Sequence, residues 1–472
     1  MKAIWLFPPM GKGFPNVSQY RFYKRMPIRA SIIYPYLAAS GVTQIRDAGH
    51  DVKLIDCSTM EKTWMDIQKD IQEADLVILE GRTPIIKEIW KAVRHVKQIN
   101  HGVKVAVYGD HVSWNPLGTL NEGADYVIQG GDYDYANAQL CNDLEKGKAH
   151  YRMLNLQVSD LDSLPVVDRE LVNWRNYFES WKKRDVFLWN MSQRGCFYHC
   201  IFCAWAETFW ENRIRYRSPR KVAEETCDLW IEYGDLEILD DADLFDFRWG
   251  LKYAAELYSK MCLKHNEVLW SCQTHPSQVL SVTDEQLKFM KKAGLSVVKL
   301  GIESSHSLSH NMMKKGSSRV MCEKAIKRLQ DANVMVHANM MIGFPWENKQ
   351  MVLESLEWIK KLDPNQAQFS LVIPYPNTEL WMMAEQNDWF IQDKMNWELY
   401  DASFPMMKMD GLSGEEIVDL YVQLWRGFYL NRKYIWRHLK TIRHWEGMKN
   451  LWRGFKSVRF GHMKAVNRER KQ

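Results

Sequence analysis

Three cysteines, Cys196, Cys200 and Cys203, lie close together in the stretch RGCFYHCIFCAW. Thiolates are soft ligands that suit zinc or an iron–sulfur cluster. A structural zinc site needs a fourth protein ligand, usually from a second pair of Cys or His residues, and the sequence has no such pair. His199 would complete a zinc site only with strained geometry, because it adjoins Cys200. A four-iron cluster normally takes four cysteines, so three would leave one iron open to a reacting molecule.

The other six cysteines are scattered singly, as buried thiols usually are. A disulfide framework is not expected in a chain of 472 residues, so we expect a reducing cytoplasm. No apolar run reaches the length of about 18 residues that a membrane-spanning helix needs. The N-terminal residues are interpreted as a first strand and its loop, and not as a signal peptide.

Residues 1–150 alternate short apolar strands with amphipathic helices, which predicts a parallel sheet covered on both faces. The segment 85–96, for example, places Ile85, Ile89 and Val93 on one helical face. Ligands of such sheets bind at the carboxyl ends of the strands. The five predicted strands are residues 2–7, 51–56, 75–80, 103–109 and 125–130.

The alternation pauses in a connector at 151–184 and resumes at 185–390, where six strand–helix units predict a partial (β/α)6 barrel. The three cysteines follow the first of these strands, at the face where barrels do chemistry. The predicted barrel strands are residues 186–191, 236–240, 268–272, 297–302, 334–342 and 367–373. The expected fold class is therefore α/β, with a Rossmann-like doubly wound domain, a partial barrel and a helical basic segment at 391–472.

The pattern C-x-x-x-C-x-aromatic-C, formed by Cys196, Cys200, Phe202 and Cys203, resembles the cluster loop of radical S-adenosylmethionine (SAM) enzymes. This resemblance implies a [4Fe–4S] cluster whose open iron chelates the amino and carboxylate groups of SAM. Reductive cleavage would then give methionine and a 5′-deoxyadenosyl radical. It also implies a reductase of the flavodoxin or ferredoxin type as electron donor.

Further stretches are similar to motifs of that family and follow in the family's order: RYRSPRKVAEE, LDDADLF, GIESS, IGFPWEN and PYPNTELW. Glu303 follows an apolar strand, where its carboxylate would accept hydrogen bonds from ribose hydroxyls or an ammonium group. A carboxylate near a helix N-terminus is the structural alternative. The resemblance adds Ser304, Gly343 and Pro345 as cofactor contacts, and a plain turn is the alternative for the last two.

The acidic run Asp240, Asp241 and Asp243 would be a metal site only with further ligands. A solvated loop is the more common role for three carboxylates without an imidazole partner. Asp240 and Asp243 therefore stay candidates for contacts with SAM or substrate.

Residues 1–150 resemble the cobalamin-binding domain of B12-dependent radical SAM enzymes. The resemblance lies in three stretches: IIYPYLAASGVTQIRDAGHDVKLIDC, YGDHVSWNP and ADYVIQGGDYDY. It makes Asp110, His111, Gly130 and Gly131 candidate cofactor contacts. A loop His beside Asp110 is more often a hydrogen-bonded surface residue.

The motif D-x-H-x-x-G, whose His ligates cobalt in many B12 proteins, is absent from the sequence. Its absence predicts base-off cobalamin without a protein imidazole on cobalt. Arg82 and Thr83, which follow the third predicted strand, are positioned to approach the lower face of the cofactor.

Residues 431–472 carry thirteen Lys and Arg against two Glu, with several aromatics, in a chain of net charge +5. Such a segment would suit nucleic acid, an anionic membrane or an acidic partner. A helical appendage with packed aromatics and solvated cations is the commoner structure, so nucleic-acid binding is not expected.

The expected activity is that of a cobalamin-dependent radical SAM methyltransferase, which passes a methyl group from SAM through methylcobalamin to an unactivated carbon. A cyclisation, ring contraction or oxygen insertion with the same cofactors is the alternative. A sensor that binds cobalamin or a metal and engages nucleic acid is a third class. A small molecule, a lipid and a peptide side chain all fit as substrate.

Overall fold

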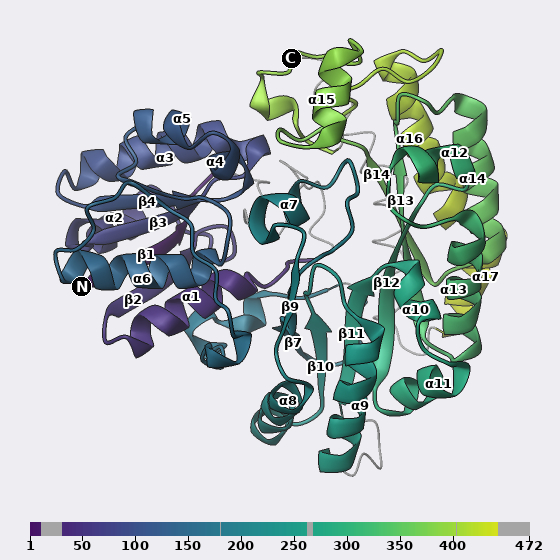
Figure 1. The fold of residues 1–472 in the computed structure, drawn as a ribbon, viewed down its shortest axis with the longest axis horizontal. Helices are drawn as coiled ribbons and strands as arrows, with labels where there is room; N and C mark the ends of the chain where they lie inside the picture. Colours follow the sequence, from purple (N-terminus) through teal and green to yellow (C-terminus); the bar gives the residue numbers. More distant parts are fainter. Residues whose placement is uncertain (11–30, 180, 262–267, 403, 442–472) are drawn as a thin grey trace.

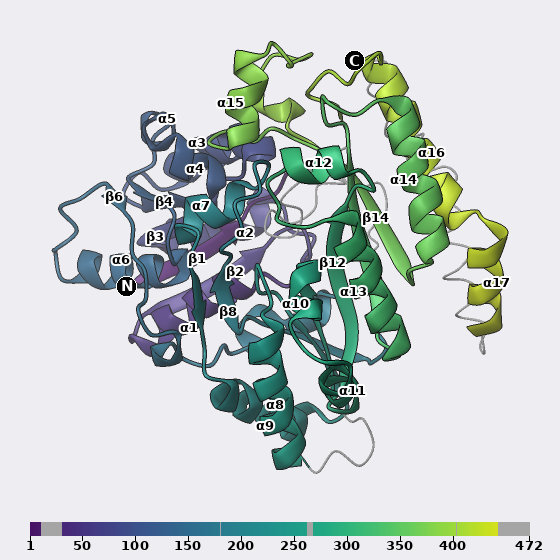
Figure 2. The ribbon, with the colours of Figure 1, turned by 45° about the vertical axis from the view of Figure 1, so that its right-hand side comes forward.

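The computed structural model describes residues 1–10, 31–179, 181–261, 268–402 and 404–441. Two six-stranded parallel sheets occupy the two halves of the molecule, each with helices packed against it (Figures 1 and 2). This is the α/β architecture expected from the sequence, with a Rossmann-like sheet followed by a half-barrel. The boundaries between the parts stay predictions.

The first sheet has the strand order β2-β1-β3-β4-β5-β6. All five residues of β3 are buried, because helices cover both faces of the sheet. The five predicted strands are confirmed, and β6 pairs with β5 from within the stretch predicted as a connector. The strands are β1 (Lys2–Phe7), β2 (Asp51–Asp56), β3 (Leu76–Glu80), β4 (Lys104–Tyr108), β5 (Tyr126–Ile128) and β6 (Met153–Leu154).

Apolar residues at helical spacing form the helices of this half. Ile89 and Val93 are buried on one face of α3, as the sequence predicts, and Ile85 is buried in the turn that precedes this helix. The helices are α1 (Tyr36–Asp47), α2 (Trp64–Glu73), α3 (Ile86–Ile99), α4 (Asp110–Trp114), α5 (Pro116–Asn121) and α6 (Tyr133–Glu145). A 3₁₀ turn, η1 (Thr83–Ile85), precedes α3.

The second sheet has the order β14-β13-β12-β11-β10-β7, and its six predicted strands are confirmed. Residues along β13 alternate between half-buried and buried, because helices cover one face and the other faces the interior of the half-barrel. The strands are β7 (Val186–Asn190), β10 (Leu236–Asp240), β11 (Val268–Thr274), β12 (Leu295–Glu303), β13 (Met335–Ile342) and β14 (Gln366–Leu371).

Local capping sets where the barrel helices begin. At the start of α8, for example, the Ser218 side chain accepts a hydrogen bond from the Lys221 N–H, and Pro219 occupies the first turn. The helices are α8 (Pro219–Tyr233), α9 (Phe247–Met261), α10 (Pro276–Leu280), α11 (Asp284–Lys292), α12 (Ser307–Met312), α13 (Arg319–Asp331), α14 (Lys349–Leu362), α15 (Glu379–Gln386), α16 (Gly414–Tyr429) and α17 (Arg432–Thr441).

A short antiparallel pair, β8 (Gln193–Gly195) and β9 (Ile214–Tyr216), together with α7 (Ala204–Trp210), lies between the two sheets (Figure 1). The sequence did not predict this pair. Residues 442–472, which carry most of the basic side chains of the stretch 431–472, lie outside the described residues. Among the described helices, none combines the length and apolar character needed to cross a bilayer.

Candidate functional site

The three cysteines lie in the loop that connects β8 to α7, and all three are half-buried. Cys203 is the N-cap residue of α7, and its N–H donates to the Cys200 carbonyl oxygen at 3.0 Å. The loop is fixed to the half-barrel at Ile201, whose N–H donates to the Met313 carbonyl and whose carbonyl accepts from the Leu380 N–H. The cysteine loop is therefore anchored to the half-barrel by backbone hydrogen bonds on both sides of Ile201.

Burial dominates the electrostatics of the thiols. It raises the pKa of Cys196 to about 12, and the Tyr198 N–H opposes this rise by hydrogen bonding to the sulfur. Burial also raises the pKa of Cys203, against the N–H groups of Ala206 and Trp205 at the start of α7. N–H groups directed at sulfur stabilise thiolates, which is the form that binds iron.

A single tetrahedral metal would need thiolate sulfurs about 3.8 Å apart, given Zn–S bonds of about 2.3 Å. No three His, Cys, Asp or Glu side chains in the described part of the chain converge in this way. A cubane cluster binds each thiolate to a different iron atom, so it does not require such convergence. The three-cysteine donor set thus fits a [4Fe–4S] cluster.

Glu303, at the end of β12, forms a buried ion pair with Lys315, with Nζ 2.5 Å from Oε1. Burial raises the pKa of the Cys200 thiol to about 12, and the Lys315 charge opposes the rise, so this ammonium lies near both the cluster loop and Glu303. Glu303 adopts the left-handed conformation, with φ of 58°, where the pairing register between β12 and β13 shifts. A strained backbone that aims a carboxylate in this way is typical of ligand sites.

Ser304 is also placed at this edge, but its hydroxyl donates to Glu347 at 2.8 Å. Phe202 lies with its ring centroid 6.2 Å from that of Phe344, which stands between Gly343 and Pro345. Gly343 adopts a φ of 94°, which favours glycine at this turn because glycine has no Cβ. The structure thus brings the predicted residues of strands β12 and β13 to the face beside the cluster loop.

The acidic run after β10 is bound into the fold. Asp240 is buried, and its carboxylate accepts hydrogen bonds from the Ser192 and Ala242 N–H groups, both at 3.2 Å. Desolvation raises the pKa of Asp240 to about 6. Asp243 accepts from the Gly195 N–H at 3.0 Å, directly before Cys196. The run supports the cluster loop and is not a solvated loop, which corrects that expectation.

The predicted residues after β3 and β4 meet at the carboxyl edge of the first sheet. Arg82 is buried and pairs with Glu80, and Thr83 donates from its hydroxyl to Asp110 at 2.9 Å. The Arg82 guanidinium also lies 4.3 Å from the ring centroid of Trp205 on α7. This edge therefore contacts the helix that follows the cysteines.

His111 is fully buried in α4, contrary to the expectation of a hydrogen-bonded surface residue. Its ring contacts Trp90, Trp114 and Trp397, with centroids 4.9 to 5.9 Å away. Neither ring nitrogen has a hydrogen-bond partner among the described residues, and burial lowers its pKa to about 3. The three tryptophans, one of which lies far along the chain, remove this ring from solvent.

Gly130 and Gly131, after β5, both have positive φ. The Gly131 N–H donates to the Phe209 carbonyl oxygen at 3.0 Å, and a Cβ on Gly130 would overlap the carbonyl oxygen of Thr208. These glycines allow the first sheet to approach the backbone of α7. The contact is a second link between that sheet and the cluster loop.

The sequence reasoning missed several residues of this region. Lys315, in the KKGSS stretch, was not singled out, although a Lys before a Gly at this edge was the available signal. His275, after β11, stacks on Tyr198 of the cluster loop with centroids 4.1 Å apart.

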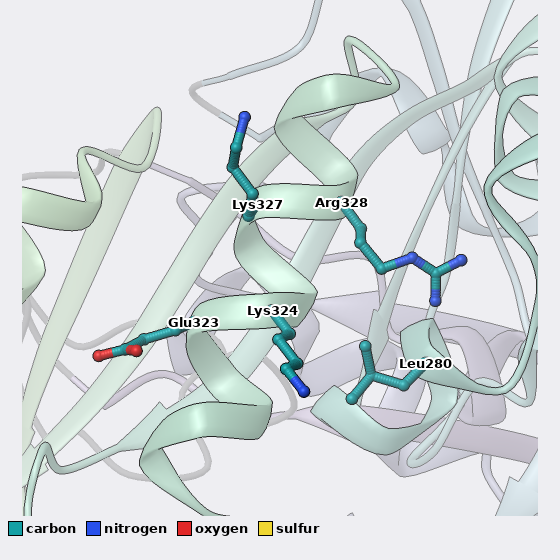
Figure 3. Close-up of a pocket in the computed structure, with 5 residues that line it drawn as sticks. All are labelled: Leu280, Glu323, Lys324, Lys327 and Arg328. Atoms are coloured by element: carbon teal, nitrogen blue, oxygen red, sulfur yellow. The ribbon is translucent and has the colours of Figure 1, made fainter.

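A hollow on the exposed side of α13 lies away from the cluster loop. It is lined by Leu280, Glu323, Lys324, Lys327 and Arg328 (Figure 3).

Comparison with known proteins bears on the whole arrangement. The model of the radical SAM superfamily matches residues 190–359. An uncharacterized methyltransferase of Pyrococcus horikoshii is 29% identical over 405 residues, covering 81% of this chain and 85% of that protein. The anaerobic magnesium-protoporphyrin IX monomethyl ester cyclase of Rubrivivax gelatinosus is 23% identical over 435 residues, covering 87% and 74%.

Among solved structures, the cobalamin-dependent SAM radical enzyme OxsB with aqua-cobalamin and SAM bound aligns with a TM-score of 0.68. The alignment covers 98% of this chain and 71% of OxsB, at 12% identity, so it shows a shared fold. Residues 190–359 of the chain therefore form a radical SAM domain, and the chain as a whole shares the two-sheet fold of OxsB.

Proposed function

We propose that the protein is a cobalamin-dependent radical SAM methyltransferase that transfers a methyl group from SAM, by way of cobalamin, to an unactivated carbon. The observation that carries this proposal is the contact between the carboxyl edge of the first sheet and α7, made by Arg82 on Trp205 and by Gly131 on Phe209. Ligands of parallel sheets bind at that edge. A cofactor held there would lie beside the cluster loop.

When bound, the cluster and SAM supply a radical that abstracts hydrogen, and cobalamin supplies the methyl group. Cys196, Cys200 and Cys203 would hold the cluster. Glu303 and Lys315 offer a carboxylate and an ammonium to the polar groups of SAM from one buried pair. Because these side chains are already paired and fixed, little reorganisation is needed when SAM binds.

Cobalamin in this proposal is base-off and has no histidine on cobalt. His111 lies next to the carboxyl edge of the first sheet, but three tryptophan rings enclose it. Arg82, with Thr83 beside it, is the group offered to the lower face. Arg82 is held in place by Glu80 and by Trp205.

A cyclisation with the same cofactors is the second candidate, because three relatives bear the name of a cyclase. The two reactions differ in the fate of the SAM methyl group. A flavodoxin or ferredoxin would supply the electrons, and we place the protein in the cytoplasm, where thiols stay reduced.

The proposal is tested with SAM that carries a CD₃ methyl group, supplied to the anaerobically reconstituted protein with reduced cobalamin. We expect mass spectrometry to find the CD₃ group on the bound cobalamin, with an equal amount of S-adenosylhomocysteine released. Cleavage to 5′-deoxyadenosine without label on cobalamin would favour the cyclisation instead. Cys200→Ala protein should still accept the label, because cobalamin binds at the other sheet.

A further inference from the structure

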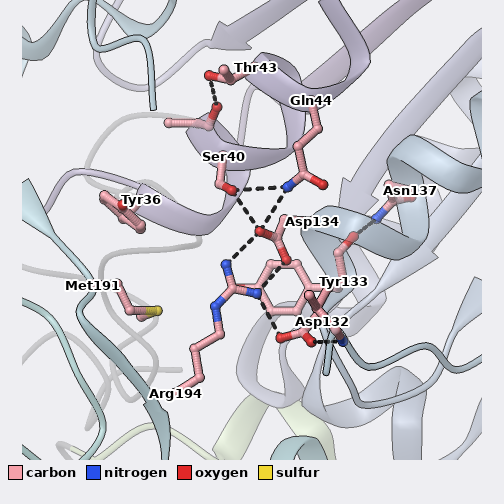
Figure 4. Close-up of polar contacts among 12 residues, drawn as sticks. Tyr36, Ser40, Thr43, Gln44, Asp132, Tyr133, Asp134, Asn137, Met191 and Arg194 are labelled. Atoms are coloured by element: carbon pink, nitrogen blue, oxygen red, sulfur yellow. Dashed lines mark hydrogen bonds and ion pairs between the residues drawn. The ribbon is translucent and has the colours of Figure 1, made fainter. Parts of the chain in front are cut away.

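Arg194 lies on β8, two residues before Cys196, and its side chain points away from the half-barrel toward the first sheet (Figure 4). There it forms ion pairs with Asp134, between Nη2 and Oδ2 at 2.7 Å, and with Asp132, between Nη1 and Oδ1 at 2.7 Å. The two carboxylates stand at the start of α6, directly after the Gly130–Gly131 turn. All three side chains are buried.

The remaining lone pairs of both carboxylates are used as well. Asp134 accepts from Ser40 at 2.7 Å and from Gln44 at 3.1 Å, both on α1 (Figure 4). Asp132 accepts from Arg215 on β9 at 2.6 Å, next to Arg194 in the antiparallel pair, and from the Val158 N–H at 2.6 Å. Two guanidinium groups thus balance two carboxylates.

Burial of these charges is costly unless every group is paired and hydrogen-bonded. Desolvation opposes ionisation of Asp132, but Arg194 and Arg215 outweigh it and keep the pKa of Asp132 below its usual value. Arginine suits this position because its planar fork reaches two carboxylates at once, whereas a lysine is a single point charge. The paired carboxylates of Asp132 and Asp134 therefore require an arginine at position 194.

The same stretch of chain is held from the other side. The Gly195 N–H donates to Asp243 of the half-barrel at 3.0 Å, and Gly195 has a φ of 101° where a Cβ would overlap the Arg213 carbonyl oxygen. Two residues of extended chain span at most about 7 Å. The Cα atom of Cys196 consequently lies within about 7 Å of the Cα atom of Arg194, whose side chain is fixed to the first sheet.

We propose that Arg194 is a positioning residue that fixes the first cluster ligand to the carboxyl edge of the first sheet, and so sets the separation between the cluster and that edge. Hydrogen abstraction and methyl transfer at one carbon require the two cofactors at a constant separation, and this consequence rests on the proposed function. The ion pairs themselves, and the separation of cluster from sheet, do not depend on it.

The test measures that separation without cobalamin. A nitroxide is attached to Met65→Cys on α2, an exposed site of the first half with 85% exposure, and unsubstituted protein controls for labelling at native thiols. Pulsed EPR then gives the distance distribution from the label to the reduced [4Fe–4S]⁺ cluster. We expect Arg194→Lys to retain the iron content of the parent protein and to widen this distribution at least twofold.

Arg169→Lys is the matched control, because Arg169 is equally buried and pairs with Glu225 at 2.6 Å without touching the cluster loop. It should leave the distribution unchanged. An unchanged width in Arg194→Lys, or an equal widening in Arg169→Lys, would overturn the proposal.

If Arg194→Lys does not fold, Asp134→Asn serves as the second variant, since Arg194 keeps its pair with Asp132. Asp134→Asn should still widen the distribution relative to the Arg169→Lys control, and an unchanged width would again overturn the proposal. Failure of CD₃ transfer in the parent protein would refute the proposed function separately, because the distance measurement uses the cluster alone.

Discussion

The two sheets of this protein present their carboxyl edges in different ways. The second sheet places cysteines, Glu303 and Lys315 at its edge, and β13 keeps one face half-buried toward the barrel interior. The first sheet is buried on both faces, and its edge loops pack against α7. The half-barrel therefore offers thiol and charged side chains at its edge, whereas the first sheet offers an edge whose loops pack closely against α7.

The largest expected effect is the loss of the cluster at the carboxyl edge of the second sheet. Cys200→Ala removes one of the three proposed cluster ligands, so affinity for the cluster should fall by more than about 100-fold, the upper range for losing even a supporting residue of a metal site, and the iron content after anaerobic reconstitution should fall with it. Formation of 5′-deoxyadenosine should be lost with it. Cys227→Ala, a half-buried thiol of α8, is the control that keeps full iron content. Full iron in Cys200→Ala would contradict the assignment.

At the carboxyl edge of the first sheet, stability should depend on how closely the backbone packs against α7. Gly130→Ala adds a Cβ at positive φ against the backbone of Thr208, so its free energy of unfolding should fall by about 2–6 kcal/mol through strain and overlap. Gly147→Ala has a nearly equal φ of 64° but open space around it, and it reports the strain alone. Urea denaturation compares the two. Equal losses would mean that the close approach to α7 does not matter.

The stability of the protein should depend on pH through Asp240, at the carboxyl edge of the second sheet. Its folded pKa of about 6 lies above the unfolded value, so the native state binds more protons and stability falls as pH rises from about 4 to 6. Asp240→Asn removes this loss. Relative to the parent protein, the variant should gain up to about 3 kcal/mol across that window, at 1.36 kcal/mol for each pKa unit. A difference that stays constant with pH would refute the shift.

The smallest effect is expected far from both edges, at the hollow on α13. Lys327 pairs with Asp331 one turn away, and both side chains are exposed. Lys327→Ala should change the free energy of unfolding by no more than about 0.5 kcal/mol and leave SAM cleavage at the parent rate. A slower cleavage rate would assign this hollow a part in the reaction.

All strands of the two sheets except the two-residue β6 were predictable, because continuous apolar runs and turn residues mark parallel strands. The pair β8 and β9 was not, because three-residue strands show no periodicity. The helix α7 was not predicted either, because it is too short to show a helical periodicity. Both elements are held by contacts from distant parts of the chain, such as the ion pairs of Arg194 with residues some 60 positions earlier.

The cysteines of the site were predictable from type and spacing, and a family resemblance added Glu303. Lys315 was not found, because its role depends on an ion pair with Glu303 that only the fold creates. The environment of His111 was predicted wrongly: the adjacent Asp110 suggested a surface loop, but Trp397 comes from a remote segment to bury it. Burial by remote residues leaves no local signal.

The most direct test of the account is anaerobic reconstitution with iron, sulfide and hydroxocobalamin, followed by EPR of the reduced protein. We expect a [4Fe–4S]⁺ signal that changes when SAM is added, together with a base-off cob(II)alamin signal without coupling to a ligand nitrogen. A cluster signal without bound cobalamin would contradict the central claim that the edge of the first sheet holds the second cofactor.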